Sequence, residues 1–457
     1  MPTRLFLAAL LALGLATTAD AAQLSDEETA RASREVVFAP PLDSDAAIAR
    51  LRAGGGKETL PALALAMRYR RLDPLIIEGA SGIAGEPILD WGGLMTWIEA
   101  HPEYPAHPSY RDIKLEVLSR IDPAFMRFLG GERSLPENMD IRLEEIVWGG
   151  VRVDGIPALD DPKLIPVGDA AYLKDDDLVF GIEINGDARA YPLRIMGWHE
   201  MFNETIGGVP VALAYCTLCG AAILYETQIE GRAAPLVFGS SGFLYRSNKL
   251  MFDRETDSLW NQFTGKPVMG PLRGSGIELK IRPVATMAWA DWKRLHPDTQ
   301  VLSLETGYDR DYGSGVVYRE YFASPDLMFP AIVGDESVAK RKDFVFGVLG
   351  VGAARAWPVA AFANEPVIND AVGVQNLVLV GDAATRTVRA YARGDRTFMA
   401  TDRPGVLKTT GGEWLVTEDA LTGPDGARLP RVAGRLGYWF AWNNYYGVES
   451  TLYGADD

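Results

Sequence analysis

Cys216 and Cys219 are the only cysteines of the 457-residue chain, and Gly220 follows the second of them directly. A tight Cys-x-x-Cys-Gly turn can aim backbone N–H groups at the sulfurs, and the glycine permits a close approach of the backbone. Zinc-binding knuckles hold two thiolates around one ion in this way. A complete structural zinc site needs two more ligands, so this pair would form half of such a site.

His199 is the histidine nearest to the cysteines along the chain, and it precedes the predicted strand that leads to Cys216. Together with Cys216 and Cys219 it would supply three protein ligands and leave one coordination position open. Such a set suits a reactive metal better than a structural one. The sequence therefore predicts a zinc or copper site at these three residues, and a methionine as fourth ligand would favour copper.

The cysteine pair also fits two functions that need no metal. A Cys-x-x-Cys pair cycles between dithiol and disulfide when one thiol is acidified. Residues 221–225 are typical of a strand, whereas thioredoxin-like proteins place a helix after the pair, and this weakens the redox alternative. A structural disulfide in a non-catalytic binding domain is the third alternative, although so short a bridge constrains the unfolded chain little.

Whether the chain is an enzyme stays open at this stage. Zinc deaminases combine His-x-Glu with Pro-Cys-x-x-Cys, and their glutamate acts as general acid and base. Here Glu200 follows His199 directly and Tyr215 precedes Cys216, so both spacings differ. In that enzyme alternative, Glu200 is the candidate general base.

A polar segment after the cysteines offers residues for a pocket beside them. Arg246, Asn248, Asp253 and Arg254 supply basic, amide and acidic side chains within a short stretch. Turns and surface ion pairs use the same residue types. The partner expected from these features is a metal or an unidentified small molecule.

The elements around the cysteines are predicted to be strands. Residues 178–184 and 187–191 flank an Asn-Gly pair, which is the signal of a hairpin with a type I′ turn. Residues 209–215 and 221–225 are apolar and rich in strand formers on either side of the cysteines. The cysteine turn should therefore connect two strands.

Part of the chain occurs twice. Residues 181–193 recur as residues 347–359, and Asn203 aligns with Asn369 when the match is extended. At the same offset the second copy has neither the cysteines nor the histidine of the first. We therefore predict an α+β fold with a duplicated, β-rich domain of pseudo-two-fold symmetry, preceded by a mostly helical N-terminal region. Only the first copy would carry a working site.

The predicted boundaries divide the chain into five parts. These are a signal peptide over residues 1–21, a helical N-terminal region over 22–150, a first β-rich repeat with the Cys-x-x-Cys site over 151–305, a connector over 306–339, and a second, degenerate β-rich repeat over 340–457.

Composition limits the partners and the location. Residues 1–21 combine a positive start, an apolar run and small residues at the expected cleavage point, as secretory signal peptides do. No later segment is long and apolar enough to span a bilayer, so a soluble periplasmic or secreted protein is expected. The net charge of −16 argues against nucleic acid and anionic membranes as partners.

Several motifs together resemble the bacterial domain-of-unknown-function family 3179 (DUF3179). They are IPALD at 156–160, AYPLR at 190–194, WHE at 198–200, NETIGG at 203–208, YCTLCG at 215–220, DRETDSLW at 253–260 and HPDT at 296–299. The resemblance covers roughly residues 150–457 and implies that both repeats belong to one fold with the site at the cysteines. The family usually has proline after the first cysteine, where this chain has Thr217. The family name implies no reaction.

Overall fold

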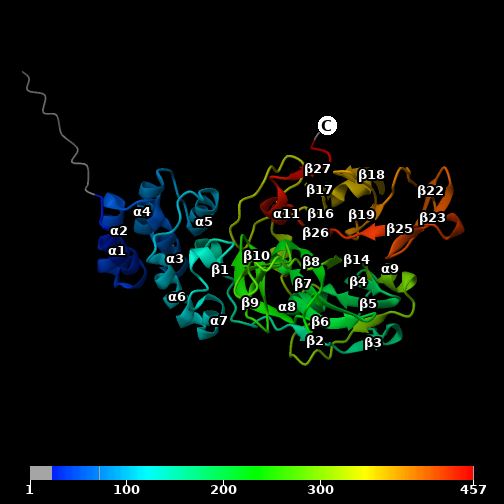
Figure 1. Cartoon of the computed structure of the whole chain (residues 1–457), viewed down its shortest axis with the longest axis horizontal. Helices are drawn as coiled ribbons and strands as arrows, with labels where there is room; N and C mark the ends of the chain where they lie inside the picture. The colour runs from blue at the N-terminus through cyan, green and yellow to red at the C-terminus, as the bar shows by residue number, and fades with distance from the viewer. Residues whose placement is uncertain (1–22, 71–72, 456–457) are drawn as a thin grey trace, which may run out of the picture. The chain divides into compact units, whose positions relative to one another are not determined.

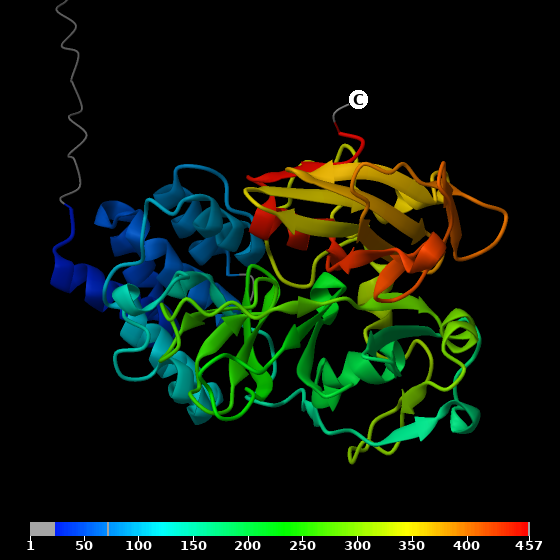
Figure 2. The ribbon, with the colours of Figure 1, turned by 45° about the vertical axis from the view of Figure 1, so that its right-hand side comes forward.

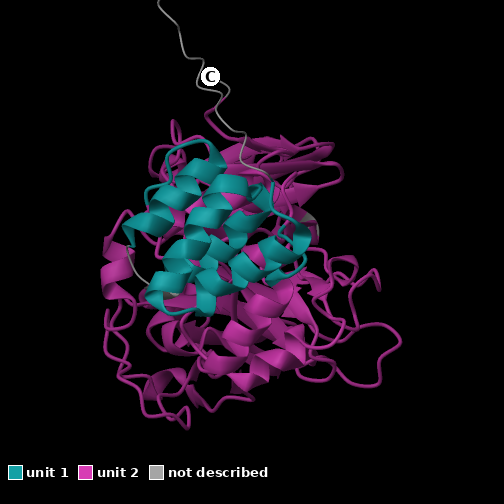
Figure 3. Ribbon diagram, turned by 90° about the vertical axis from the view of Figure 1, so that its left-hand side faces the viewer, with its two compact units in different colours: residues 1–89, 106–110 teal, residues 90–105, 111–457 magenta. Residues whose placement is uncertain are grey.

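The computed structural model describes residues 23–70 and 73–455, so the predicted signal peptide lies outside the described residues. The chain divides into two compact units, coloured separately in Figure 3. The N-terminal unit comprises residues 1–89 and 106–110, and the C-terminal unit comprises residues 90–105 and 111–457. Within the described residues, no helix is both long enough and apolar enough to cross a membrane.

The N-terminal unit is helical, and local sequence sets its helix ends. Ser25 and Glu28 form a reciprocal capping box that satisfies free N–H groups at the start of α1. Asp73 caps α4, and Gly85 ends it at a φ of 83°, a conformation that glycine adopts without strain. The helices are α1 (Asp26–Phe38), α2 (Pro41–Gly54), η1 (Lys57–Thr59), α3 (Leu60–Arg70) and α4 (Pro74–Ala84).

The C-terminal unit begins with further short helices before its sheets (Figure 1). They are α5 (Trp91–Ala100), α6 (Tyr110–Ile121, all but its first residue), η2 (Pro123–Phe125), α7 (Met126–Leu129), η3 (Pro136–Asn138) and η4 (Leu143–Glu145).

Three five-stranded sheets follow the short helices, and the cysteine turn connects two strands of the second sheet. The first, in spatial order, contains β1 (Ile146–Trp148), β9 (Phe238–Tyr245), β10 (Asn248–Asp253), β11 (Leu259–Asn261) and β12 (Lys266–Met269). The second contains β13 (Ile281–Arg282), β8 (Ala221–Glu226), β7 (Val209–Cys216), β6 (Met201–Ile206) and β2 (Leu159–Asp160). The third contains β14 (Ala285–Ala288), β4 (Leu178–Ile184), β5 (Asp187–Pro192), β15 (Gln300–Leu302) and β3 (Leu164–Pro166).

Short helices lie between these strands and after them. They are η5 (Val167–Asp169), α8 (Leu193–His199), η6 (Thr217–Cys219), α9 (Trp289–Leu295) and α10 (Arg319–Ala323).

Two more sheets are formed by the last third of the chain, coloured yellow to red in Figure 2. A four-stranded sheet has the order β26 (Arg435–Tyr438), β16 (Phe344–Gly350), β17 (Ala353–Pro358) and β27 (Ser450–Leu452). An eight-stranded sheet has the order β18 (Val367–Val372), β19 (Gln375–Asp382), β20 (Thr387–Ala392), β25 (Arg428–Val432), β24 (Ala420–Thr422), β23 (Gly412–Val416), β22 (Val406–Thr409) and β21 (Met399–Ala400). The helices of this part are η7 (Val359–Ala363), η8 (Pro424–Gly426) and α11 (Trp439–Tyr446).

Strand β7 carries the first cysteine and is buried on both faces. Leu213 and Tyr215 face one hydrophobic cluster, whereas Ala214 and Cys216 face another. Successive side chains of a strand point to opposite faces, so a strand between two cores is apolar throughout. This explains the uninterrupted apolar run that leads to Cys216.

The coarse predictions are confirmed: the chain is α+β, with most helices in its N-terminal part and the sheets after them. The predicted hairpin is β4–β5, and Asn185 and Gly186 have the positive φ angles of 52° and 84° that a type I′ turn requires. The strands predicted on either side of the cysteines are β7 and β8. The glycines and serines of residues 238–248 are typical of a turn, but Phe238–Tyr245 form strand β9.

Candidate functional site

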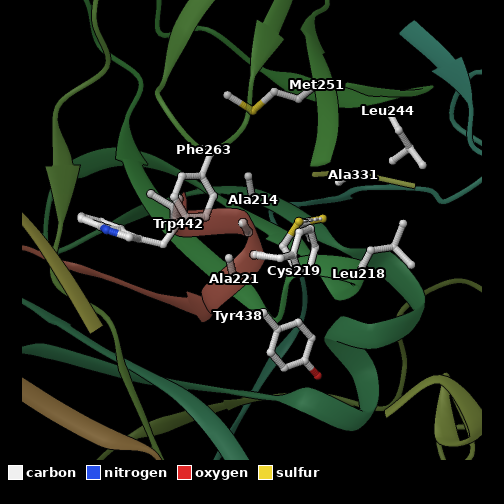
Figure 4. Close-up of a cluster of buried hydrophobic side chains, with 14 of the residues drawn as sticks. Ala214, Leu218, Cys219, Ala221, Leu244, Met251, Phe263, Ala331, Tyr438 and Trp442 are labelled. Carbon is white, nitrogen blue, oxygen red and sulfur yellow. Dashed lines mark hydrogen bonds between the residues drawn. The ribbon is translucent and has the colours of Figure 1, made fainter. Parts of the chain in front are cut away.

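The cysteine turn joins β7 to β8 and brings both sulfurs together. Cys216 ends β7, Cys219 ends the single turn η6, and the two Sγ atoms lie 3.0 Å apart as free thiols. Gly220 has a φ of 60°, and a Cβ there would lie 2.8 Å from Cε1 of Phe344. Both the backbone angle and the close neighbour therefore require glycine. Figure 4 shows Cys219 in its apolar surroundings beside Leu218 and Ala221.

The β9–β10 hairpin turn lies against the sulfurs. Arg246 and Ser247 both have positive φ, at 50° and 59°, an unfavourable backbone conformation for residues other than glycine or asparagine. The carbonyl oxygen of Ser247 lies 3.4 Å from Sγ of Cys219 and can accept its thiol proton. The strained turn thus places backbone polar groups on the cysteine pair.

A buried amide network supports the second sulfur. Nδ2 of Asn248 donates to Sγ of Cys219 over 3.2 Å and to Oε1 of Gln262 over 2.8 Å. Nε2 of Gln262 in turn donates to the carbonyl oxygens of Ala214 and Ala221, at 2.8 and 3.3 Å, on either side of the cysteine turn. The two amides tie the β9–β10 hairpin to the turn between β7 and β8.

The surroundings shift the pKa values of the two thiols in opposite directions. Burial raises the pKa of Cys216, and so does the negative charge of Glu200. Hydrogen bonds from the Cys219 side chain and from the backbone N–H groups of Lys249 and Cys219 outweigh both effects and bring this pKa below its usual value of 9.0. Burial and the neighbouring Cys216 raise the pKa of Cys219 well above that value. The site therefore favours a thiolate at Cys216 with Cys219 as its protonated partner.

Glu200 lies next to the turn in a buried ion pair. Its residue has a φ of 56° directly after α8, and its Oε1 accepts from the Thr217 hydroxyl over 2.6 Å. Nζ of Lys249 lies 3.0 Å from Oε2 of Glu200, in a geometry that does not make a hydrogen bond. Both side chains are buried, so the pair places one carboxylate and one ammonium in the core beside Cys216.

Helix α10 covers the cysteine turn. The Tyr321 hydroxyl donates to the carbonyl oxygen of Leu218 over 2.6 Å, and the Tyr318 hydroxyl lies 3.4 Å from Oε1 of Glu200. Cys216 and Cys219 expose 2% and 0% of their surface. The cysteines are therefore shielded from reagents in solution, and α10 forms part of their cover.

His199 is held by two partners, neither of which is a cysteine. Its Nδ1 lies 2.9 Å from the carbonyl oxygen of Pro157, which can only accept, so Nδ1 carries the proton. Its Nε2 lies 2.6 Å from the Tyr312 hydroxyl. Burial lowers the pKa of His199, which favours this neutral form. Across the described part of the chain, no three His, Cys, Asp or Glu side chains are grouped so that they could hold a metal ion.

The four predicted pocket residues separate into two places. Asn248 contacts Cys219, and Arg246 in the adjoining turn donates from Nε to Glu145 over 2.7 Å. At the far end of β10, Asp253 accepts from the Trp260 indole over 2.9 Å, and Arg254 donates to Asp154 over 2.8 Å. Asp253 therefore stabilises a turn and Arg254 forms a surface ion pair, and both lie away from the sulfurs.

Sequence reasoning missed two contributors to the site. Lys249 is a single lysine before an apolar run, and a charged residue in a buried strand is the signal that could have singled it out. Tyr321 belongs to the connector, where nothing in the sequence indicates a contact with the cysteines. Thr217, noted as a departure from the family's proline, supplies a hydroxyl that binds Glu200.

The fold and the site define an α+β protein with a buried dithiol turn between two strands. The family described as "Protein of unknown function (DUF3179)" matches residues 153–449, which is more than half of the chain. The chain therefore belongs to this family, as the motifs indicate. No curated protein and no solved structure matches it.

Proposed function

We propose that the protein is a thiol–disulfide oxidoreductase whose redox centre is the pair Cys216 and Cys219. The observation that carries this proposal is the 3.0 Å approach of two free sulfurs, in surroundings that lower the pKa of Cys216 and raise that of Cys219. A low-pKa thiol is the nucleophile of such exchange reactions, and a neighbouring thiol resolves the intermediate.

The proposed reaction transfers two electrons to a disulfide substrate, R–S–S–R′. The Cys216 thiolate attacks one substrate sulfur, forms a mixed disulfide and releases R′–S⁻. Cys219 then loses its proton and attacks the Cys216 sulfur, which forms the Cys216–Cys219 disulfide and releases R–S⁻. The two leaving thiolates take up two protons, so the substrate is reduced and the protein dithiol oxidised. Glu200 is the candidate for accepting the Cys219 proton.

A zinc or copper ion on the same two cysteines is the second candidate function. The backbone N–H groups aimed at Cys216 favour it, because they stabilise a thiolate ligand as well as a nucleophile. The two thiolates would supply half of a tetrahedral ligand set. His199 would join them only after leaving Pro157 and Tyr312, its present partners.

Single-cysteine variants distinguish these functions. Metal content and alkylatable thiols are first measured on protein purified without chelator. Reduced protein is then mixed with 5,5′-dithiobis(2-nitrobenzoate). We expect no metal, a fast reaction in the unchanged protein that ends in an internal disulfide, and a lasting mixed disulfide in Cys219→Ser. The matched Cys216→Ser variant should react slowly.

Three outcomes would count against the redox proposal. One metal ion per chain that is lost in both variants would support the metal site instead. Thiols that react only after denaturation would indicate a structural dithiol. A disulfide with a reduction potential below about −300 mV would indicate a structural bridge, because such bonds resist reduction by cellular thiols.

We also propose that residues 151–305 and 340–457 are two copies of one domain, the second without the site. The matching sheet orders β14-β4-β5-β15 and β26-β16-β17-β27 support this, because in each the first two pairings are antiparallel and the third is parallel. Asn203 and Asn369 each exchange two hydrogen bonds with a phenylalanine backbone, Phe238 and Phe398 respectively.

Export to the periplasm or medium remains part of the proposal. It rests on residues 1–21 of the sequence and would place the pair in an oxidising compartment, where disulfides form and persist. Edman sequencing of the mature protein from the native host tests it, because cleavage after residue 21 would give a new N-terminus.

A further inference from the structure

A pocket lies beside the cysteine turn, and none of the site residues predicted from the sequence line it. Its volume is about 700 Å³, within the range typical of small-molecule sites. Tyr215 from β7, Phe344 from β16 and Tyr438 at the end of β26 line it with aromatic rings. Tyr215 directly precedes Cys216, and a Cβ on Gly220 would lie 3.2 Å from the Tyr438 ring, so this wall adjoins the dithiol.

Two phenol groups of this wall have no hydrogen-bond partner in the part of the chain that the structure describes. Tyr215 and Tyr438 each expose only 4% of their surface. Within the described residues, neither hydroxyl makes a hydrogen bond, whereas other buried tyrosines, such as Tyr225 and Tyr391, donate to carbonyl oxygens. Neither hydroxyl oxygen is among the buried side-chain atoms without a partner, so both face the open space of the pocket. These two donors are therefore free to bind a ligand that accepts hydrogen bonds.

Three cations of the pocket also lack a carboxylate partner among the described residues. They are Arg319, Lys342 and Arg386. The Arg386 guanidinium stacks 4.4 Å from the centre of the Phe344 ring, on a backbone with a φ of 60°. Nζ of Lys342 donates to the carbonyl oxygens of Tyr321 and Ser324 and makes no ion pair. With the residues that the structure describes, the Arg319 side chain makes neither a hydrogen bond nor an ion pair.

The carboxylates of the pocket do not cancel this charge. Asp177 forms an ion pair with Arg194 at 2.8 Å. Asp343 accepts from the Lys340 backbone over 2.8 Å, and it and the exposed Asp176 are the carboxylates without a cation. The unpaired charge is thus positive, in a protein of net charge −16. A charge opposite to that of the whole molecule, focused in one pocket, attracts anions.

We propose that this pocket binds a small organic anion. The negative group of the ligand would lie between the Arg386 and Lys342 cations and accept hydrogen bonds from the phenols of Tyr215 and Tyr438. Its flat or apolar body would pack on the aromatic wall. Carboxylates and phosphate esters both meet this description, and the inference does not rest on the redox function proposed above.

Isothermal titration calorimetry of the full mature chain with three probes tests the proposal. Benzoate and phenyl phosphate carry the two anionic groups on the same ring, and benzamide is the neutral match for benzoate. We expect one or both anions to bind at one site per chain, and benzamide to bind at least about tenfold more weakly, as the loss of a charged hydrogen bond predicts. The anion that binds more tightly identifies the group that the pocket prefers.

Variants assign the binding to this pocket. Arg386→Gln and Tyr438→Phe should each weaken anion binding, the first by about tenfold or more. Arg396→Gln is the matched control, because Arg396 also stacks on an aromatic ring, 5.3 Å from Trp414, and does not line the pocket. Cys216→Ser should leave binding unchanged. Equal binding to Arg386→Gln, equal binding of benzamide, or no anion binding at millimolar concentration would overturn the proposal.

Discussion

Nδ2 of Asn248 lies 3.2 Å from Sγ of Cys219 and is the side-chain amide that holds this sulfur. The same hydrogen bond lowers the pKa of Cys219, against the larger effects of burial and of Cys216. Nδ2 also donates to Gln262, whose own amide is tied to both strands that flank the cysteine turn. One asparagine therefore connects the electrostatics of the thiol pair to the geometry of the turn.

Asn248→Ala should raise the pKa of Cys219 further and destabilise the fold by about 1–3 kcal/mol, because Oε1 of Gln262 loses its donor in the core. Urea unfolding followed by tryptophan fluorescence measures the stability, and the pH dependence of alkylation in a Cys216→Ser background measures the pKa. Asn376→Ala, in a half-buried asparagine of β19, should change neither. An unchanged Cys219 pKa would show that the amide does not act on the sulfur.

Glu200→Gln should lower the pKa of Cys216, because the carboxylate charge of Glu200 disfavours the thiolate. The midpoint of the alkylation rate against pH should therefore move to lower pH. The variant should also lose about 3–5 kcal/mol of stability, because Lys249 stays buried without its counter-charge.

Glu226→Gln is the control for this prediction. Glu226 ends β8, in the sheet that also contains the Cys216 strand β7, and it forms ion pairs with Lys280 and Arg282. Its loss should leave the alkylation midpoint where it was. A midpoint that stays fixed in Glu200→Gln as well would remove Glu200 from the electrostatics of the site.

Tyr321→Phe should increase the alkylation rate of the buried thiols about fivefold. The hydrogen bond from the Tyr321 hydroxyl to the carbonyl oxygen of Leu218 holds α10 over the cysteine turn. A neutral hydrogen bond of this kind contributes about 1 kcal/mol to stability. The rate of iodoacetamide incorporation, followed by mass spectrometry, measures the opening. Tyr308→Phe removes a hydroxyl from the exposed part of the same connector and should not alter the rate. Equal rates in both variants would mean that another segment controls access.

Local signals predicted the parts of the fold that local sequence determines. The β4–β5 hairpin follows from an Asn-Gly pair, and β7 and β8 follow from apolar runs. Strand β9 could not be predicted, because its Gly-Ser-rich sequence is typical of a turn. The structure gives the reason for one of these glycines: a Cβ on Gly239 would lie 2.6 Å from Cε1 of Phe252. Tertiary packing here overrides strand propensity.

The approach of the two cysteines could be predicted, because both thiols lie in one turn. The groups that shift the pKa values of the thiols or cover them could not be predicted, because they lie on β10, at the end of α8 and on α10. Arg246 and Ser247 form a turn with two positive φ angles without the glycine or asparagine that would signal it. Whether His199 ever joins the cysteines remains a prediction, since in this structure its ring nitrogens contact Pro157 and Tyr312.

Glu418 should make the protein sensitive to acid. It is buried, and burial raises its pKa, but the charges of Arg389 and Arg431 outweigh this and lower the pKa to about 2. Because the unfolded pKa is about 4.5, the stabilisation is complete above pH 4.5 and is lost as the pH falls towards 2. The shift corresponds to stability on the order of 3 kcal/mol.

Glu418→Gln should therefore lower stability at pH 7 by several kcal/mol, since two buried arginines lose their counter-charge. It should also flatten the decline in unfolding free energy between pH 4.5 and pH 3, measured by urea titration at each pH. Glu413→Gln is the control, because Glu413 is 61% exposed and pairs with the exposed Arg403, a contact of little energetic weight. If both variants keep the acid slope of the unchanged protein, other carboxylates cause the acid sensitivity.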